Sequence, residues 1–323
     1  MLRKELGIDI GTTQITICGH DGDTVFREPN VAALDVDTAE VVEAGFAARK
    51  IAADAPDRVR LCWPVWDPLV RNIDILAAIL RIFLRRIMGR AILRPQVMVS
   101  IPCDLTEAQT NALEDAVLSA GASSVHLLEA PLCAALGAGL DFSKPEGQML
   151  VHIGASRTES AVIFLGDMVT HVTVPVGGNR FDSAIIKHMR ERYQLDIGRR
   201  TAEQIKMRFG LFAGENAPKT LDIKGKCLKT GQPRIVTVPR EDMPGALREP
   251  LAAVLDAVCL TVERTAPELC ADIEKNGVVL TGGGILKGMD QFFADVIRLR
   301  TRIAAEPQLA AARGAVRALA KLK

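Results

Sequence analysis

Apolar residues form two stretches that resemble each other and lie about half a chain apart. The first covers residues 6–17 and is broken by Gly11; the second covers residues 149–164 and is broken by Gly154. In each, a glycine at a tight turn separates two predicted strands, and a second turn pattern follows. The two glycines are 143 positions apart in a chain of 323 residues. This offset favours an internal duplication.

Between these stretches the pattern predicts a strand, a helix and a second helix. Residues 97–101 form a short apolar run that is typical of a buried strand. The pattern Thr106-x-x-Gln109 predicts a capping box, and Gly121 predicts the end of the helix that the box begins. Small residues over 132–139 predict a helix that neighbouring backbones can approach closely.

The second half of the chain continues the same alternation. Asn179 is predicted to cap a helix whose apolar face includes Phe181 and Ile185, and the pattern Thr201-x-x-Gln204 is predicted to begin another helix. Residues 216–231 indicate an insertion with a hairpin, and residues 277–284 a strand that runs into a glycine turn before a helix. Alternating strands and helices indicate an α/β fold.

Composition narrows the class of protein. The chain is 48% hydrophobic and 24% charged, which is typical of a folded protein, and its length predicts about two domains. Its net charge of +1 argues against a protein that mainly binds nucleic acid. The seven cysteines contain no Cys-x-x-Cys pair, so neither a disulfide framework nor a zinc site is predicted. The N-terminal segment lacks the long apolar run of a signal peptide, and no stretch is long and apolar enough to cross a bilayer, so we expect a cytoplasmic protein.

Three glycine turns follow three predicted strands, at residues 11–13, 154–156 and 282–284. Glycine lets a backbone approach a ligand, and successive N–H groups can form a nest for phosphate oxygens. The alternative is that each glycine only allows the chain to turn. Three such turns, two of them related by the duplication, favour two hairpins that hold a phosphate chain between them.

Several motifs, in their order along the chain, resemble those of one superfamily. The resemblance is carried by Asp9-Ile-Gly-Thr-Thr13, residues 129–140, Val176-Gly-Gly-Asn-Arg-Phe-Asp182, Thr201-Ala-Glu-Gln-Ile-Lys206, Leu280-Thr-Gly-Gly-Gly284 and Ala312-Arg-Gly314. Together they resemble the actin/Hsp70/sugar-kinase superfamily, and within it the bacterial actins of the MreB family. This resemblance implies a duplicated actin-like (ribonuclease H-like) α/β fold with a nucleotide cleft between two domains, residues 1–147 and 148–323. Each domain is expected to carry a small inserted subdomain, roughly at residues 33–68 and 190–250.

The same resemblance implies a site for ATP or ADP with Mg²⁺. Asp9 is expected to hold the metal through water, and Thr158 to place the attacking water. Glu203 and Lys206 are expected to flank the adenosine; the alternative is a solvent-exposed salt bridge between them. The residues expected to bind the nucleotide are Gly11, Thr12, Thr13, Gly154, Ala155, Ser156, Arg157, Gly178, Glu203, Lys206, Gly282, Gly283 and Gly284.

Two positions depart from the family pattern. Ala130 stands where the family has the glutamate that orients the attacking water, and His152 stands where it has an aspartate. Loss of such a group costs about 10²–10⁴-fold in rate, so at most weak ATP hydrolysis is expected. His152 is either a metal ligand or a hydrogen-bonded structural residue. Arg157 either supplies charge to the phosphates or points to solvent from a hairpin tip.

An apolar pair surrounded by arginines suggests contact with a membrane. Ile92 and Leu93 are adjacent in a predicted loop, and the cations near them in sequence are Arg85, Arg86, Arg90 and Arg94. Anionic lipid attracts such a segment, and the corresponding loop of MreB-like proteins inserts into the membrane. The alternative is that Ile92 and Leu93 fold back under the strand that begins at residue 97.

The function that the resemblance implies is that of a cytoskeletal protein. It is expected to form head-to-tail filaments on the inner face of the cell membrane, to organise cell shape or wall synthesis, and to contact itself and membrane proteins of cell elongation, with no nucleic acid partner. Two alternatives remain: an actin-like scaffold that does not hydrolyse nucleotide, and a small-molecule kinase of the same superfamily. The kinase needs a catalytic aspartate that faces a sugar, and the sequence offers no obvious one.

Overall fold

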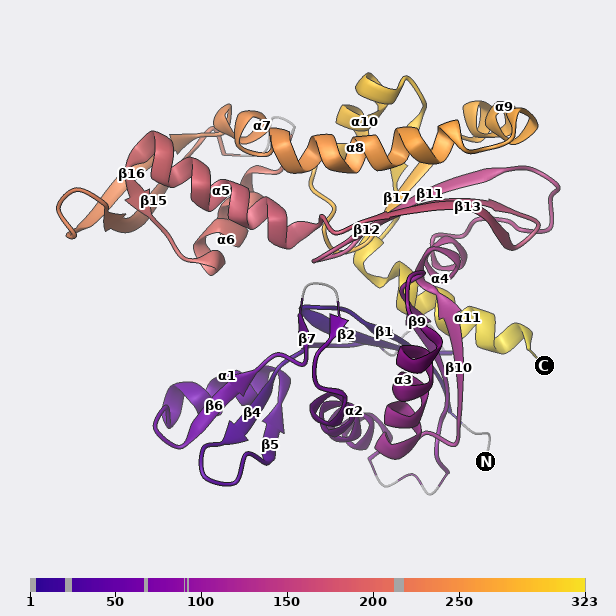
Figure 1. Ribbon diagram of the computed structural model, residues 1–323, viewed down its shortest axis with the longest axis horizontal. Coiled ribbons are helices and arrows are strands. Elements are labelled where there is room, and N and C mark those ends of the chain that lie inside the picture. The colour runs from indigo at the N-terminus through magenta and orange to yellow at the C-terminus, as the bar shows by residue number, and fades with distance from the viewer. Residues whose placement is uncertain are drawn as a thin grey trace. The chain divides into compact units, whose positions relative to one another are not determined.

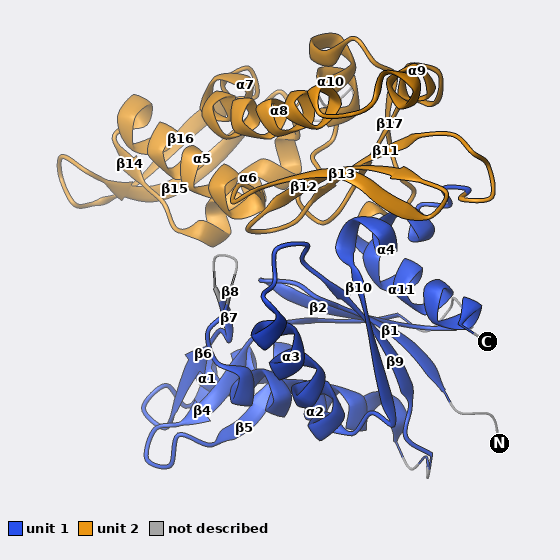
Figure 2. Ribbon diagram, turned by 45° about the vertical axis from the view of Figure 1, so that its right-hand side comes forward, with its two compact units in different colours: residues 1–141, 308–323 blue, residues 142–307 orange. Residues whose placement is uncertain are grey.

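The chain folds into two compact units. The computed structural model describes residues 4–20, 25–66, 69–89, 91, 93–211 and 218–322. Unit 1 consists of residues 1–141 and 308–323, and unit 2 of residues 142–307 (Figure 2). The sequence placed the division at 147/148 and the C-terminal segment in the second half. In the structure this segment is part of unit 1, because its helix packs on the main sheet of that unit.

A five-stranded mixed sheet forms the centre of unit 1. Its strand order is β10-β9-β1-β2-β3, in which β1, β2 and β3 form an antiparallel meander and β9 and β10 run parallel to β1. The parallel strands require crossover connections, which the helices of this unit supply. The strand bounds are β1 Glu5–Ile10, β2 Gln14–Gly19, β3 Val25–Pro29, β9 Gln96–Ile101 and β10 Ser124–Glu129.

Helices cover both faces of this sheet (Figure 1). Helices α2 (Ile73–Met88) and α3 (Glu107–Ala120) bury their apolar residues against Leu6 and Ile8 of β1. On the opposite face, α11 (Ala310–Lys321) packs against β1 and α4 (Ala130–Gly137), and follows a short 3₁₀ turn, η1 (Pro307–Leu309). The capping box at Thr106 is present, and Gly121 ends α3 with a φ of 120°.

A small subdomain branches from β3. Its sheet has the order β5-β4-β6 and packs on α1 through a small apolar cluster that includes Val31 and Ala48. A two-stranded hairpin follows before α2. The bounds are β4 Ala32–Asp35, β5 Val41–Ala44, α1 Gly45–Asp54, β6 Val59–Cys62, β7 Val65–Trp66 and β8 Leu69–Val70.

Unit 2 repeats the sheet of unit 1. The order is β13-β12-β11-β17-β18, again a meander of three antiparallel strands followed by two parallel ones. The strands contribute Met149, Val151 and Leu280 to a large core that also takes residues from α5, α8 and α10. The bounds are β11 Gln148–Ile153, β12 Thr158–Phe164, β13 Asp167–Val174, β17 Val278–Thr281 and β18 Thr301–Ile303.

A second small sheet and, within the described residues, six helices complete unit 2. The predicted hairpin over 216–231 is present as β15 and β16, although its strands extend to residue 239 and residues 212–217 lie outside the described part. The bounds are α5 Gly178–Tyr193, β14 Leu195–Asp196, α6 Arg199–Phe209, β15 Thr220–Cys227, β16 Pro233–Pro239, α7 Asp242–Ala246, α8 Arg248–Glu263, α9 Pro267–Asn276 and α10 Met289–Ile297.

The two glycine hairpins have the same geometry, which supports the duplication. In unit 1 the N–H of Gly11 donates to the carbonyl of Gln14, and in unit 2 the N–H of Gly154 donates to the carbonyl of Arg157. The strand registers match as well, since Ile10 faces Ile15 and Ile153 faces Thr158. Every residue of the first set corresponds to one 143 positions later in the second.

Two predicted helix starts are wrong. Helix α5 begins at Gly178 with Gly177 as its N-cap rather than Asn179, and α6 begins at Arg199 with Gly198 as its N-cap rather than Thr201. Neither cap residue supplies a side chain. At α5, the carbonyls of Gly154 and Ala155 accept from the first N–H groups of the helix, so a tertiary contact replaces a side-chain cap.

Candidate functional site

The glycine turn of unit 1 lies at the end of β1 and is held by a buried asparagine. The Nδ2 of Asn30 donates to the carbonyl of Gly11 at 2.9 Å, and the N–H of Asn30 donates to the carbonyl of Thr13 at 3.0 Å. Asn30 is fully buried, whereas Thr13 is exposed and Thr12 half-buried. The turn therefore has a fixed backbone and presents residues 12 and 13 at its surface.

Asp9 lies one residue before the end of β1. It is half-buried and shares a face of the sheet with Gly7, on which α11 packs. Burial, and then the nearby charge of Asp9, raise the pKa of the Cys133 thiol on α4. Asp9 also favours the charged form of Arg27 on β3, although burial lowers the pKa of that arginine. This single carboxylate at a strand end suits Mg²⁺, which usually keeps several waters and binds one or two protein carboxylates together with phosphates.

In unit 2 the glycines 282–284 have different environments. A Cβ on Gly282 would lie 2.2 Å from the carbonyl oxygen of Ile153, and one on Gly284 would lie 2.5 Å from that of Gly154. These two glycines allow β17 to pack against the end of β11. Gly283 is exposed, and a Cβ there would meet nothing within 4 Å. Of the three, Gly283 is the one whose surface is open to a ligand.

The start of α5 packs directly on the turn that follows β11. The N–H of Gly178 donates to the carbonyl of Gly154 at 3.0 Å, and a Cβ on Gly177 would lie 2.5 Å from the same oxygen. Thr158, the first residue of β12, is fully buried and donates its hydroxyl to the carbonyl of Val176 at 2.7 Å. Strands β11 and β17 and helix α5 thus meet at one corner of unit 2, which we call the unit 2 corner (residues 152–158, 176–178 and 281–284).

Lys206 extends from α6 to this corner. Its ammonium lies 2.7 Å from Oδ1 of Asp182 and donates to the carbonyl of Gly178 at 3.0 Å. Both side chains are nearly fully buried, and burial raises the pKa of Asp182 although Lys206 opposes the shift. Glu203 is exposed. The alternative of an exposed salt bridge between Glu203 and Lys206 is therefore wrong, because Lys206 is paired with Asp182 inside the unit.

His152 is a hydrogen-bonded residue of the core. Its Nδ1 lies 3.1 Å from Oγ1 of Thr281 on the neighbouring strand, and its exposed fraction is 9%. Burial lowers the pKa of His152 to about 4, so the imidazole is neutral near pH 7. Among the described residues, no group of three or more His, Cys, Asp or Glu is arranged to hold a metal. The structural alternative for His152 agrees with this geometry.

Ala130 and Arg157 are also buried. Ala130 is the first residue of α4 in unit 1 and is 7% exposed, while Glu129 before it is half-buried. Arg157 is 7% exposed, so the alternative of an arginine pointing to solvent is wrong. Ser156 beside it is also buried, whereas Ala155 is half-buried.

The predicted membrane segment is only partly described. Ile92 and Arg90 lie outside the described residues. Leu93 is 37% exposed and Arg94 is exposed, so Leu93 does not fold back under β9. In the part of the chain that the structure describes, every helix is too short or too polar to span a bilayer.

Sequence reasoning missed three residues that hold these parts in place. Asn30 secures the first turn, Asp182 neutralises Lys206, and Thr281 bonds His152. Each contacts a residue more than 15 positions away, so no local sequence pattern predicts the contact. The sequence did find the residues of the unit 2 corner, which the structure brings together from separate parts of the chain: Gly154, Gly178, Lys206 and 282–284.

Comparisons with known proteins agree with this geometry. The family model of the MreB/Mbl protein matches residues 3–323. The chain is 33% identical to the cell shape-determining protein Mbl of Bacillus subtilis (strain 168), over 95% of this chain and 93% of that protein. It is also 33% identical to the cell shape-determining protein MreB of Escherichia coli (strain K12), over 99% and 94%. The crystal structure of MreB5 of Spiroplasma citri bound to ADP has a TM-score of 0.89 at 29% identity and covers 99% of this chain and 97% of its own.

Proposed function

Because the chain belongs to the MreB/Mbl family of bacterial actins, we propose that it is a nucleotide-binding cytoskeletal protein that determines cell shape. The Mbl and MreB relatives support this role, since both are cell shape-determining proteins that match almost the whole chain. The observation that carries nucleotide binding is the open surface of Gly283 at the corner where β11, β17 and α5 meet. The similar MreB5 of Spiroplasma citri was crystallised with ADP and with AMPPNP.

The proposed ligand is ATP or ADP with Mg²⁺. Thr13 and Gly283 are exposed, and Thr12, Gly154 and Ala155 are half-buried, which supports a role for these residues in contacting phosphate and sugar oxygens. Lys206 places a positive charge beside Gly178, and Glu203 is the exposed polar group of the same helix. Asp9 would hold Mg²⁺ through water, and the bound ion would neutralise phosphate charge.

Weak hydrolysis is part of the proposal. Ala130 offers only a methyl group where a carboxylate could orient water, and His152 is a neutral, buried group engaged with Thr281. Thr158 is fully buried and donates its hydroxyl to the carbonyl of Val176, so it has little access to an attacking water. These observations also favour the second candidate, an actin-like scaffold that binds nucleotide without hydrolysing it.

Filaments and membrane contact complete the proposal. We expect head-to-tail assembly on the inner face of the cell membrane, with Ile92 and Leu93 in the lipid contact and membrane proteins of cell elongation as further partners. The exposed Leu93 beside Arg94 supports the lipid contact, because apolar and cationic groups together bind anionic bilayers.

Sedimentation tests the function directly. The purified protein should pellet with ATP and Mg²⁺ and should remain in the supernatant without nucleotide. Liposomes that contain anionic lipid should co-sediment with it, and the variant Leu93→Ser should reduce that fraction without changing pelleting in the absence of lipid. Protein that stays soluble under every nucleotide condition would contradict the cytoskeletal role.

A further inference from the structure

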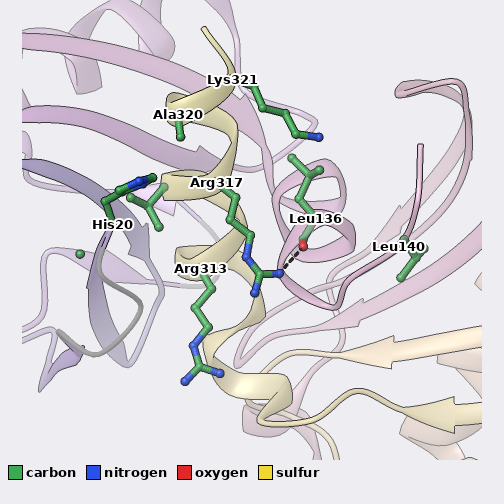
Figure 3. A pocket seen from close by; sticks show the side chains of 9 residues that line it. His20, Leu136, Leu140, Arg313, Arg317, Ala320 and Lys321 are labelled. Carbon is green, nitrogen blue, oxygen red and sulfur yellow. Dashed lines mark hydrogen bonds between the residues drawn. The ribbon is translucent and has the colours of Figure 1, made fainter. Parts of the chain in front are cut away.

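A cationic pocket lies in unit 1, at the end of β2 opposite to the glycine turn at residues 11–13. It has a volume of about 450 Å³ and is formed where the end of β2, the end of α4 and one side of α11 meet. Helix α11 contributes Arg313, Arg317 and Lys321, which lie four positions apart and therefore on one side of the helix (Figure 3). The remaining lining residues are Gly19, His20, Leu136, Leu140, Val316 and Ala320.

The pocket combines positive charge with an apolar wall. Leu136 and Leu140 come from α4 and the segment after it, and Val316 and Ala320 from α11. None of the described residues that line the pocket is Asp or Glu. This composition suits a ligand that carries carboxylates around an apolar group.

The cations differ in what they already contact. Arg317 donates from Nη1 to the carbonyl of Leu136 at 2.8 Å and to that of Gly137 at 3.2 Å, so it holds the end of α4 (Figure 3). Lys321 is exposed, and in the described part of the chain no carboxylate pairs with it. His20 lies 3.6 Å from a Glu5 oxygen. Lys321 is thus the cation most available to a partner.

Unit 1 also carries a surface of negative charge. The turn between β4 and β5, which we call the acidic turn (residues 35–40), contains Asp35, Asp37 and Glu40, and its residues 36–40 are all exposed. No Lys or Arg occurs between residues 29 and 48. Val36 in this turn is 57% exposed.

The backbone of the acidic turn is preorganised. Oδ1 of Asp35 accepts from the N–H groups of Asp37 and Thr38 at 3.0 and 2.9 Å, which lowers the pKa of Asp35. Arg58 is near Asp35, but among the described residues neither Asp37 nor Glu40 has a cationic partner. The turn therefore presents an exposed apolar side chain, Val36, next to the available carboxylates of Asp37 and Glu40.

The two surfaces belong to opposite sides of unit 1 and cannot meet within one unit. In both ribbon views, β4 and β5 lie at one end of unit 1 and α11 at the other (Figures 1 and 2). From their complementary charge and apolar content, we propose that the acidic turn of one molecule docks in the cationic pocket of the next. Because the two patches differ, the contact is heterologous and can repeat without closing, which produces a filament. This inference rests on the proposed self-assembly and assigns residues to it.

Carbodiimide crosslinking tests the contact without requiring filaments. The reagent activates a carboxylate, and the Lys321 amine then displaces the activating group to form an amide. Mass spectrometry of a mixture of nitrogen-15-labelled and unlabelled protein with ATP and Mg²⁺ should find Lys321 joined to Asp37 or Glu40 in mixed-label peptides. Absence of this product, or its presence only within one label, overturns the inference.

Charge reversal gives a second readout. Lys321→Glu, which leaves the Arg317 bonds to α4 intact, should raise the critical concentration for pelleting about tenfold. Combining it with Glu40→Lys should restore most of the loss, whereas the matched reversal Lys287→Glu in unit 2 should leave assembly unchanged. Nucleotide-dependent pelleting that Lys321→Glu does not weaken overturns this contact while leaving the proposed function in place. Wild-type protein that never pellets instead contradicts the proposed function.

Discussion

Gly282 and Gly283 of the unit 2 corner differ in how tightly they are packed, and this difference should be measurable as a difference in stability. A methyl group at Gly282 would clash with the carbonyl of Ile153, and the φ of 101° at this position is strained for any residue with a side chain. A methyl group at Gly283 would meet nothing within 4 Å. Gly282→Ala should therefore lower the free energy of unfolding by about 1–3 kcal/mol, and Gly283→Ala by no more than about 0.5 kcal/mol. Urea unfolding of both variants measures this.

Gly283→Ala should affect ATP binding although it hardly affects stability. Because Gly283 faces the space where the nucleotide is proposed to lie, Gly283→Ala should weaken ATP binding about tenfold while the protein stays as stable as the wild type. Equal affinity for ATP in Gly283→Ala and wild-type protein would remove Gly283 from the nucleotide site.

Removing only Lys206 from its buried pair with Asp182 should destabilise the protein more than replacing both residues by apolar ones. Lys206→Met leaves the Asp182 carboxylate buried without its cation, and should cost about 3–5 kcal/mol of unfolding free energy. The double variant Lys206→Met with Asp182→Leu removes both charges and should recover most of that loss. A double variant no more stable than the single one would show that the two residues act independently.

His152 should make the protein sensitive to acid. Its pKa is about 4 in the folded chain and about 6.5 in the unfolded chain, so the unfolded state binds the proton more readily between these values. The stability from the neutral imidazole is complete above pH 6.5 and is lost as the pH falls toward 4, at about 1.4 kcal/mol per pH unit. His152→Asn, which can still bond Thr281, should show a smaller loss between pH 6.5 and 4; equal slopes would contradict this origin.

At the scale of single elements, α11 and α4 pack closely against each other through glycines in unit 1. A Cβ on Gly314 would lie 1.6 Å from the carbonyl oxygen of Cys133, so Gly314→Ala must push the helices apart. We expect a loss of about 1–3 kcal/mol in unfolding free energy. Gly245→Ala is the matched control, because Gly245 lies in the short helix α7 and a Cβ there would meet nothing within 4 Å. Similar losses in both variants would contradict the packing argument.

The sequence predicts the ends of a helix well only where the residues that cap it are neighbours in sequence. The capping box at Thr106 and the turn at Gly121 involve neighbours in sequence, and both were predicted correctly. Asn179 was predicted as the N-cap of α5, but the N-cap is Gly177, because the carbonyls of residues 154 and 155 accept from the first N–H groups of the helix. The same limit hid Asp182, whose partner Lys206 comes from another helix.

At the scale of the whole molecule, the sequence predicts the duplication. It does not predict that the C-terminal segment, residues 308–323, belongs to unit 1. The offset between Gly11 and Gly154 predicted two similar halves, and the two sheets share their strand order. The return of residues 308–323 to unit 1 depends on long-range packing of α11 against β1, which periodicity does not record. The family resemblance, in contrast, extends over the whole chain and was recognised from six short motifs.

We propose that this chain binds one adenine nucleotide at its glycine turns, with Gly283 in contact with the ligand. Isothermal titration of the purified protein with ATP and Mg²⁺ tests it most directly. We expect saturable uptake of one nucleotide per chain, and weaker uptake in Gly283→Ala. A titration of correctly folded wild-type protein that shows no saturable heat with either ATP or ADP would contradict it.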